Sequence, residues 1–213
     1  QSVVINGYAT SAHRFNFSGA NFSGMDLQAA EFVNGYNFGS GVPERPINFS
    51  NANLRGARFT ECSMNGSNFS NADLEGAYLT DAALARCNFE GANLKNSSSY
   101  NSGFYNANLK NADLSNSQFQ SSYLKSADLR EANLSGANFT RAFMAEADFR
   151  GANLAGADLT EANLWGADLT GADLTGATLA RANLGNVKGY VTEKDRRIAE
   201  LEAQLSTVTA ERD

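Results

Sequence analysis

Large hydrophobic residues recur at every fifth position over most of the chain. From Phe49 to Leu184 each fifth residue is Leu, Phe or Met, except Ser99, and the residue two places earlier is Ala, Ser or Cys, except Ile47. An α-helix repeats every 3.6 residues and a strand every two, so neither explains this period. One large and one small inward side chain per five residues predict a chain that turns a corner every five residues.

Four such corners close a square coil of 20 residues. Coils stacked as neighbouring β-strands lie about 4.8 Å apart, with the large side chains filling the axis and the small ones letting the walls approach. The run from 49 to 184 then forms about seven coils and a rod about 34 Å long. Phe17, Phe22, Leu27 and Phe32 mark an earlier coil. The sequence therefore predicts an all-β solenoid of about eight coils.

The repeat resembles that of the pentapeptide-repeat family, whose pattern is A(D/N)LXX. The segments Ala152-Asn153-Leu154-Ala155-Gly156 and Ala167-Asp168-Leu169-Thr170-Gly171 match this pattern letter for letter, and the resemblance covers residues 17–186. It implies the right-handed quadrilateral β-helix of that family.

The repeat divides the chain into three parts. We expect residues 1–16 to form an N-terminal cap, 17–186 the β-helix, and 187–213 a linker followed by an amphipathic helix. Between Phe32 and Phe49 the period slips, and this segment contains Pro43 and Pro46. We therefore expect a loop insertion over 33–48. It is either a surface insertion without a role or, as in some members of the family, a site of partner recognition.

Residues 192–213 have the pattern of an amphipathic, coiled-coil-like α-helix. The segment Thr192-Glu193-Lys194-Asp195 approximates a capping box. The apolar residues that follow are spaced 3, 4 and 3 apart, as in a coiled-coil seam: Ile198, Leu201, Leu205 and Val208. This seam predicts a homo-oligomer joined through the C-terminal helix. The alternative is that the helix covers the open end of the β-helix.

Two of the four outer faces carry a uniform column of Asn and Asp immediately before the large residues. Short polar side chains of this kind bond backbone N–H groups at corners. Within one column, an acidic ladder of Asp128, Asp148 and Asp168 lies on consecutive coils. These carboxylates should repel one another unless they are hydrogen-bonded or bridged by ions. Corner capping or a cation-binding or phosphate-like role are the two interpretations.

The other two faces carry the outward aromatic residues. Tyr78 and Tyr100 lie on the third face, and a column on the fourth consists of Tyr105, Tyr123, Phe143 and Trp165. The core does not need them, because the inward positions beside them are already occupied. They are either an interaction patch or a ladder that stabilises the β-surface.

Composition excludes most catalytic chemistry. The chain has 17 Lys and Arg against 23 Asp and Glu, a formal net charge of −6, one histidine and two cysteines. His13 lies before the first coil, and Cys62 and Cys87 fall in small inward positions, where a disulfide is not expected. No phosphate-binding, dinucleotide, zinc or nucleophile-elbow motif occurs. We expect no catalytic residue, no metal site, no cofactor, no membrane span and no direct binding of nucleic acid.

These features favour a non-enzymatic scaffold, a rigid rod that binds an unknown protein partner and displays a loop near one end. The family resemblance supplies an alternative, since members of the quinolone-resistance type bind DNA gyrase as mimics of duplex DNA. Between residues 49 and 186, however, 14 acidic and 10 basic residues are interspersed. The chain begins with Gln1, as after removal of a signal peptide or trimming. The first interpretation favours export to a periplasm, a lumen or the exterior over the cytoplasm.

Overall fold

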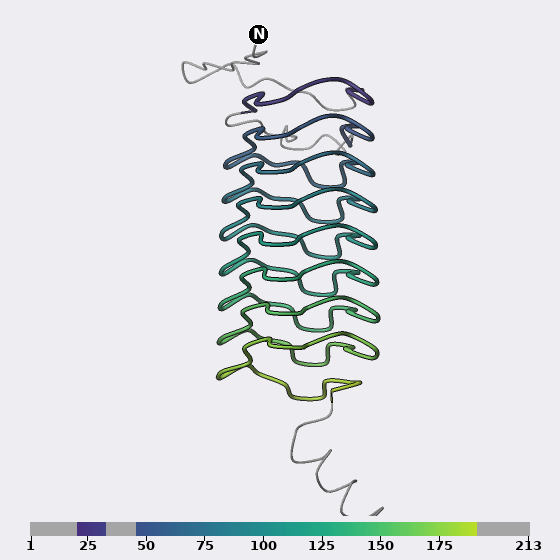
Figure 1. Ribbon diagram of the computed structural model, residues 1–213. Helices are drawn as coiled ribbons and strands as arrows, with labels where there is room; N and C mark the ends of the chain where they lie inside the picture. The colour runs from purple at the N-terminus through teal and green to yellow at the C-terminus, as the bar shows by residue number, and fades with distance from the viewer. Residues whose placement is uncertain (1–20, 33–45, 191–213) are drawn as a thin grey trace, which may run out of the picture.

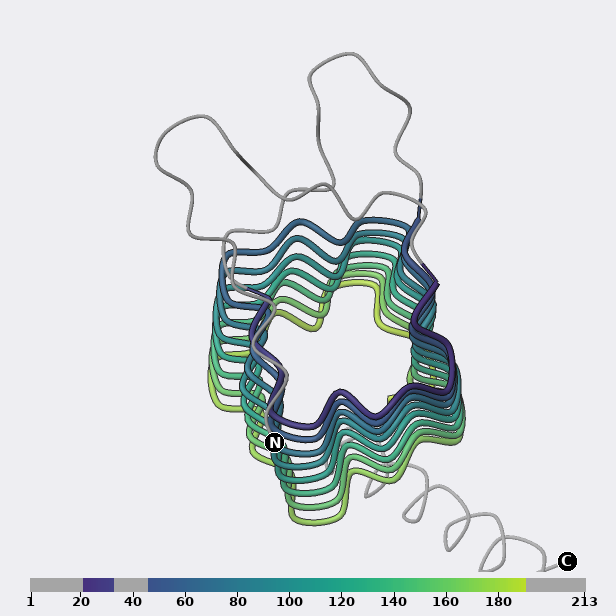
Figure 2. The same ribbon diagram turned by 90° about the horizontal axis from the view of Figure 1, so that it is seen from above.

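The protein is a stack of four-sided coils (Figure 1). The computed structural model describes residues 21–32 and 46–190. Seen along the stack, the coils superimpose in a square outline with projecting corners (Figure 2). Consecutive coils pair through parallel bridges between residues 20 apart, such as Asn48 with Asn68 and Asn68 with Asn88. The expected period of four five-residue sides is therefore the period of the fold.

The coils are numbered here from the residue that opens the first face. Coil 1 is 48–67, coil 2 is 68–87, coil 3 is 88–107, coil 4 is 108–127, coil 5 is 128–147, coil 6 is 148–167 and coil 7 is 168–187. Each side contributes a bridge of a single residue, and the described residues contain no longer strand and no helix. The bridge residues of coil 4 on the first to fourth faces are Asn108, Asp113, Gln118 and Tyr123.

The slip in the hydrophobic period corresponds to a longer connection between the third face, at Glu31, and the first face, at Asn48. Residues 21–32 precede coil 1 and pair with it at an offset of 27, as in Asn21 with Asn48 and Glu31 with Arg58. Seven residues more than one coil are therefore inserted before the wall resumes. It resumes by Ile47, which is buried, and Asn48, which is bridged, within the range expected for the loop.

Several predicted segments fall outside the described residues. These are the cap 1–16, the first hydrophobic mark Phe17, the loop residues 33–45, and the C-terminal segment 191–213 with its seam of Ile198, Leu201, Leu205 and Val208. The helix and its role in oligomerisation remain predictions.

Every corner requires a left-handed backbone at one residue. The second residue after each large hydrophobic position has a positive φ, from 53° at Asn101 to 72° at Gly171. A hydrogen bond closes the corner, as from Ala52 N to Phe49 O at 3.0 Å. Glycine adopts this conformation without strain and Asn with little, but Glu131 and Arg141 adopt it too. The fold therefore carries local strain at several corners.

The core is a continuous column along the axis. In its N-terminal half, rings on one face stack on consecutive coils, with centroids 5.0 Å apart for Phe49 and Phe69 and 4.8 Å for Phe69 and Phe89. Ser99 is the exception among the large inward positions: it is fully buried, and its Oγ forms no hydrogen bond with any described residue. In the last coil, by contrast, Leu174 and Leu179 are only partly buried.

Candidate interaction faces

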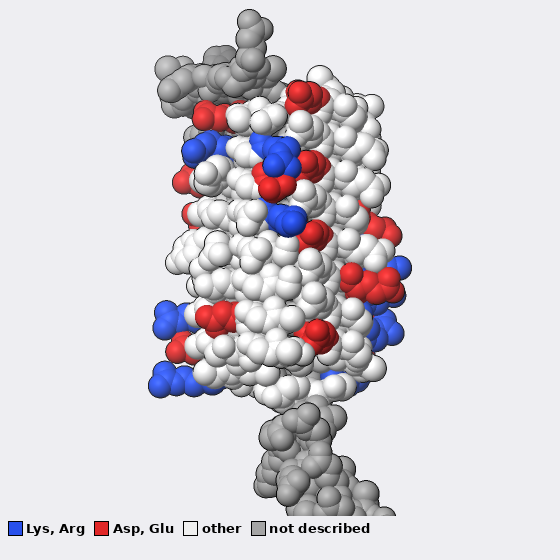
Figure 3. Space-filling model, viewed as in Figure 1, with Lys and Arg blue, Asp and Glu red and all other residues white. Residues whose placement is uncertain are grey.

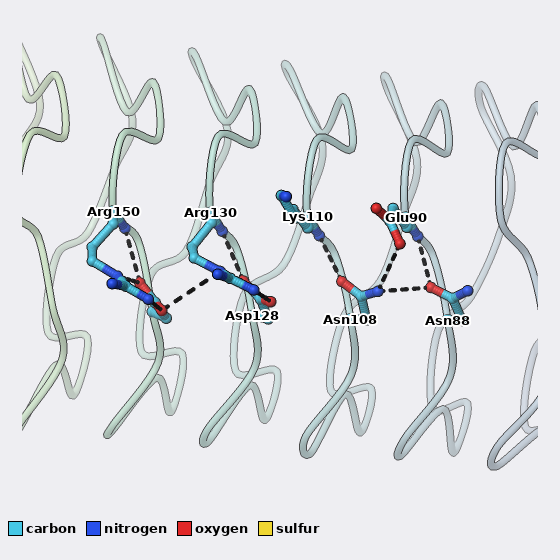
Figure 4. A network of polar contacts seen from close by, with 8 residues as sticks. Asn88, Glu90, Asn108, Lys110, Asp128, Arg130 and Arg150 are labelled. Atoms are coloured by element: carbon cyan, nitrogen blue, oxygen red, sulfur yellow. Dashed lines mark hydrogen bonds and ion pairs between the residues drawn. The ribbon is translucent and has the colours of Figure 1, made fainter.

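The first face carries a ladder of hydrogen-bonded polar side chains along its coils (Figure 4). Each Asn or Asp accepts a hydrogen bond from the backbone N–H two residues later, as Asn108 Oδ1 does from Lys110 N at 3.1 Å. Between coils the amides bond one another, with Asn108 Nδ2 donating to Asn88 Oδ1 at 2.9 Å. The column thus caps each corner that follows the first face and also ties neighbouring coils together.

Arginines neutralise two members of the acidic ladder. Arg130 Nη2 lies 2.6 Å from Asp128 Oδ2, and Arg150 Nη2 lies 2.6 Å from Asp148 Oδ2. Arg130 also reaches the next coil, with its Nε 3.7 Å from Asp148 Oδ2. Hydrogen bonds from Arg130 and Arg150 hold the pKa values of Asp128 and Asp148, respectively, below the usual carboxyl value. The expected repulsion is therefore relieved by the chain's own cations.

The third member of the ladder, Asp168, is held differently. Its Oδ1 accepts the backbone N–H of Thr170 at 3.0 Å, and hydrogen bonds from Thr170 lower its pKa. On the second face, repulsion between carboxylates is avoided because Asn residues separate most of the Asp residues along the column. An Asn amide on one coil donates to an Asp on the coil before, as Asn93 Nδ2 does to Asp73 Oδ1 at 2.9 Å.

Three of the four aromatic residues expected on the fourth face form a stack along the rod. The ring centroids of Tyr105 and Tyr123 are 5.6 Å apart, and those of Tyr123 and Phe143 are 5.1 Å apart with planes inclined by 7°. We call these three residues the aromatic stack. Phe143 is 46% exposed and Tyr105 is 40% exposed, while Tyr123 between them is half-buried. Desolvation raises the pKa of the Tyr105 hydroxyl.

Glycine makes room for the aromatic side chains that leave the corners. A Cβ atom at Gly103 would lie 3.7 Å from ring carbons of Tyr105, so this ring lies over the glycine and aligns with Tyr123. Trp165 leans over Gly185 of the next coil, where a Cβ would lie 2.8 Å from the indole Cδ1. Trp165 is therefore exposed on the same face but forms no ring stack with the aromatic residues that the structure describes.

The two aromatic residues of the third face lie apart from this stack. Tyr78 is capped by the guanidinium of Arg58, whose Cζ is 4.5 Å from the ring centroid. Tyr100 is 51% exposed and follows the buried Ser99. The six candidate residues thus comprise a three-ring stack, Trp165 on the same face, and two separate tyrosines.

Charged side chains are unevenly distributed over the surface. A belt without charged residues crosses the middle of the face seen in Figure 3, between charged groups nearer the two ends. The sequence itself contains the uncharged runs 96–109, 114–124 and 132–140. Tyr100, Tyr105 and Tyr123 fall within these runs. These three tyrosines therefore lie in uncharged stretches of the chain, whereas Phe143 lies between Arg141 and Glu146.

No described group of side chains has the composition of a metal site. Residues 21–32 and 46–190 contain no cluster of three or more His, Cys, Asp or Glu that could hold a metal ion. Cys62 and Cys87 are buried thiols whose Sγ atoms donate to backbone carbonyls, Cys62 to Phe32 O and Cys87 to Met64 O at 3.0 Å. No helix in the described part of the chain is long and apolar enough to cross a membrane.

Comparison with known families agrees with this architecture. The family described as pentapeptide repeats matches in eight overlapping copies between residues 47 and 188. The chain belongs to the pentapeptide repeat family. Members form right-handed quadrilateral β-helices, as the resemblance implied. Among proteins with curated descriptions, no sequence matches this pentapeptide repeat protein.

Several solved structures of pentapeptide repeat proteins are similar to the chain. HetL from Nostoc sp. strain PCC 7120, involved in the regulation of heterocyst differentiation, is 24% identical over 85% of this chain and 94% of its own, with a TM-score of 0.48. Rfr23 from Cyanothece 51142 is 40% identical over 44% of this chain and 61% of its own, with a TM-score of 0.40. QnrB1, a plasmid-mediated fluoroquinolone resistance protein, is 23% identical over 89% of this chain and 94% of its own, with a TM-score of 0.47.

Proposed function

We propose that this pentapeptide repeat protein is a non-enzymatic scaffold that binds a protein partner through its fourth face. The observation that carries the proposal is the aromatic stack. Elsewhere on the rod the outward columns are mostly short polar residues that bond their own corners, whereas Tyr105, Tyr123 and Phe143 present rings that neither the core nor a corner requires. Tyr, Trp and Phe are enriched at protein–protein interfaces, and Tyr and Trp also at their binding hot spots.

The fold suits such a role because it holds the face rigidly. Each coil is hydrogen-bonded to the coils on either side, for example Tyr123 N to Ser102 O at 2.9 Å and Leu124 N to Phe143 O at 2.7 Å. The rings are therefore preorganised, and binding does not have to order the backbone beneath them.

Site-specific photocrosslinking in the cells that produce the protein tests the proposal. A photoreactive residue replaces Phe143 in one variant and Asn153, exposed on the second face, in a matched control. We expect a discrete protein adduct from position 143 that weakens when Tyr123→Ser is added. The same adducts from both positions would show that the fourth face has no special role.

We further propose that the C-terminal helix expected over 192–213 joins copies of the chain. The support is the spacing of Ile198, Leu201, Leu205 and Val208 in the sequence. Light scattering on the full chain and on a Leu201→Glu, Leu205→Glu variant tests this seam. Loss of the oligomer in the variant is expected. Equal masses for the two proteins would exclude the helix as the contact.

Inhibition or protection of DNA gyrase is the alternative function. It draws support from the family, but mimicry of DNA needs outward carboxylates that are free to replace phosphates. Asp128 and Asp148 are instead covered by Arg130 and Arg150. A supercoiling assay with and without a fluoroquinolone decides the matter. We expect no inhibition and no protection at micromolar protein, and either effect would make gyrase the primary candidate.

A further inference from the structure

We infer that two copies of this chain associate through their fourth faces, with the rods antiparallel. The twofold axis lies in the plane of the face and crosses the rod between coils 3 and 4. Coil 3 of one copy then lies opposite coil 4 of the other, coil 2 opposite coil 5, and coil 1 opposite coil 6. The inference rests on the proposed role of this face in binding and names a second copy as the partner.

The pattern of large and small side chains on the face is self-complementary in this arrangement. Along its midline the N-terminal coils carry small residues, Ser63, Ala83 and Gly103, whereas the next two coils carry Tyr123 and Phe143. The antiparallel axis places the exposed ring of Phe143 opposite Ala83. Near the axis, the Tyr105 ring over Gly103 meets Tyr123 of the other copy. Projecting rings thus face small residues or pack as aromatic pairs, as an isologous contact requires.

The charges at the two borders of the face pair in the same register. On the corner before the fourth face, Asp81 of coil 2 lies opposite Arg141 of coil 5. On the corner after it, Arg86 of coil 2 lies opposite Glu146 of coil 5. All four side chains are exposed. Because the axis lies across the rod, each border meets its own copy, so both opposite-charge pairs form twice.

A shifted antiparallel arrangement loses this complementarity. An axis through coil 4 would place Lys125 opposite itself and leave Arg86 facing Gly166. In the favoured arrangement the single like-charged pair at the borders, Glu61 and Glu161, falls at the outer end of the contact.

Parallel rods are disfavoured by the fit of their side chains rather than by charge. Each coil would then face its own equivalent, and the two borders would exchange places, so that Arg86 would lie opposite Asp81. At the midline, however, Phe143 would meet Phe143 while Ala83 met Ala83. The rings would hold the two faces apart at one end and leave a gap between the small residues at the other.

The contacts that these charged side chains already make within one copy still allow them to form ion pairs with a second copy. Arg86 forms no side-chain hydrogen bond or ion pair with any residue that the structure describes. Glu146 contacts Lys125 at 3.5 Å and Ser126 at 3.2 Å. Arg141 pairs with Glu161 at 2.7 Å, which offsets the like charge of Glu61. Arg86 is therefore the border cation with the most to gain.

The size of the contact sets the expected affinity. Six coils at about 4.8 Å give a strip about 29 Å long and one face wide. Such a strip is smaller than the roughly 800 Å² per partner of a standard interface. We therefore expect a reversible dimer that dissociates in the micromolar range.

Sedimentation velocity on the full chain, over about 1 to 200 µM, tests the inference. The variants are Arg86→Glu, Glu146→Arg and the double variant, with Lys95→Glu as control. Lys95 lies on the second face, so its reversal changes net charge as Arg86→Glu does but leaves the contact intact. We expect each single reversal to weaken the dimer about tenfold, the double variant to regain most of that loss, and the control to match the wild type.

The outcomes separate this inference from the other proposals. A monomer at 200 µM, or equal weakening by Arg86→Glu and Lys95→Glu, would overturn it. A double variant weaker than either single one would overturn the antiparallel arrangement, because parallel rods pair Arg86 with Asp81 instead of Glu146. An oligomer that survives both single reversals but is lost in the Leu201→Glu, Leu205→Glu variant would assign the contact to the C-terminal helix. Crosslinking of a different protein at position 143 would leave the scaffold function standing in every case.

Discussion

Replacing Ser99 by leucine should stabilise the protein. Ser99 is fully buried at a large inward position, between Leu79 and Phe119 of the adjacent coils, and its Oγ has no hydrogen-bond partner in the part of the chain that the structure describes. After the Ser99→Leu change, the four large inward positions of coil 3 would hold two Phe and two Leu. Coil 1 already accommodates a comparable set of two Phe, one Leu and one Met, so the new side chain does not exceed what a coil can enclose.

The size of the gain follows from two contributions. An unpaired buried hydroxyl costs about 1–3 kcal/mol, and each buried methylene contributes about 0.8 kcal/mol. Phe104 is tilted against both Phe89 and Phe119, at 48° and 47°, so part of the space beside Ser99 is already used. Strain from repacking would offset about 1 kcal/mol or more. We expect a net gain of about 2 kcal/mol in the free energy of unfolding, or a rise of about 4–8 °C in melting temperature.

Thermal and urea unfolding monitored by circular dichroism measure this gain, with Ser102→Leu as the control. Ser102 is equally buried but occupies a small position, and its Oγ donates to Leu79 O at 2.5 Å. The control should therefore be destabilised. A Ser99→Leu variant no more stable than the wild type, together with a destabilised Ser99→Ala, would refute the reasoning, because the hydroxyl would then have a partner such as a buried water.

Three further predictions concern a corner, the ladder and the aromatic stack. Gly156→Ala should lower the free energy of unfolding by about 1 kcal/mol, since φ is +67° and no atom lies near the new methyl group, so backbone strain alone acts; urea denaturation checks this. The lowered pKa values of Asp128 and Asp148 make their contribution to stability complete above the unfolded carboxyl pKa of about 3.9 and lost as pH falls through the folded values. Urea midpoints between pH 7 and pH 3 should therefore fall at the acid end, and less so in Asp128→Asn; parallel curves would contradict the pairing. Tyr123→Ser should remove two ring contacts and cost about 1–3 kcal/mol without unfolding the rod, as a thermal melt would show, whereas complete loss of the fold would assign the stack to stability.

The sequence predicted the wall of the rod far better than the side chains at its corners. The period of five determines which residues point inward and which share a face, because those depend only on backbone geometry. The slip before Phe49 likewise predicted extra residues; the offset of 27 between Glu31 and Arg58 gives their number as seven, and the form of the loop stays a prediction. The burial of Ser99 at a large position also follows directly from its place in the repeat.

The contacts of corner side chains were harder to predict from the sequence, because these side chains turn back over the faces. Arg130 and Arg150 follow Asp128 and Asp148 by two residues, and each arginine turns back onto its aspartate. The same geometry carries Tyr105 over Gly103. A column of residues in the sequence gives the order of backbone positions, not the rotamers that decide which side chains meet. An Arg two places after Asp, or a Gly two places before Tyr, is the signal that could have revealed these contacts.

Because the coils repeat every 20 residues, the residue number alone determines the coil and the face on which each outward side chain lies. Duplication or loss of one whole coil changes the length of the rod by about 4.8 Å and leaves each later residue on its original face. A change of five residues between Tyr123 and Phe143 would instead rotate everything after it by a quarter turn and break the aromatic stack. Such a chain can therefore lengthen or shorten in whole coils without losing the pattern on its faces, and a face-specific function restricts it to those steps.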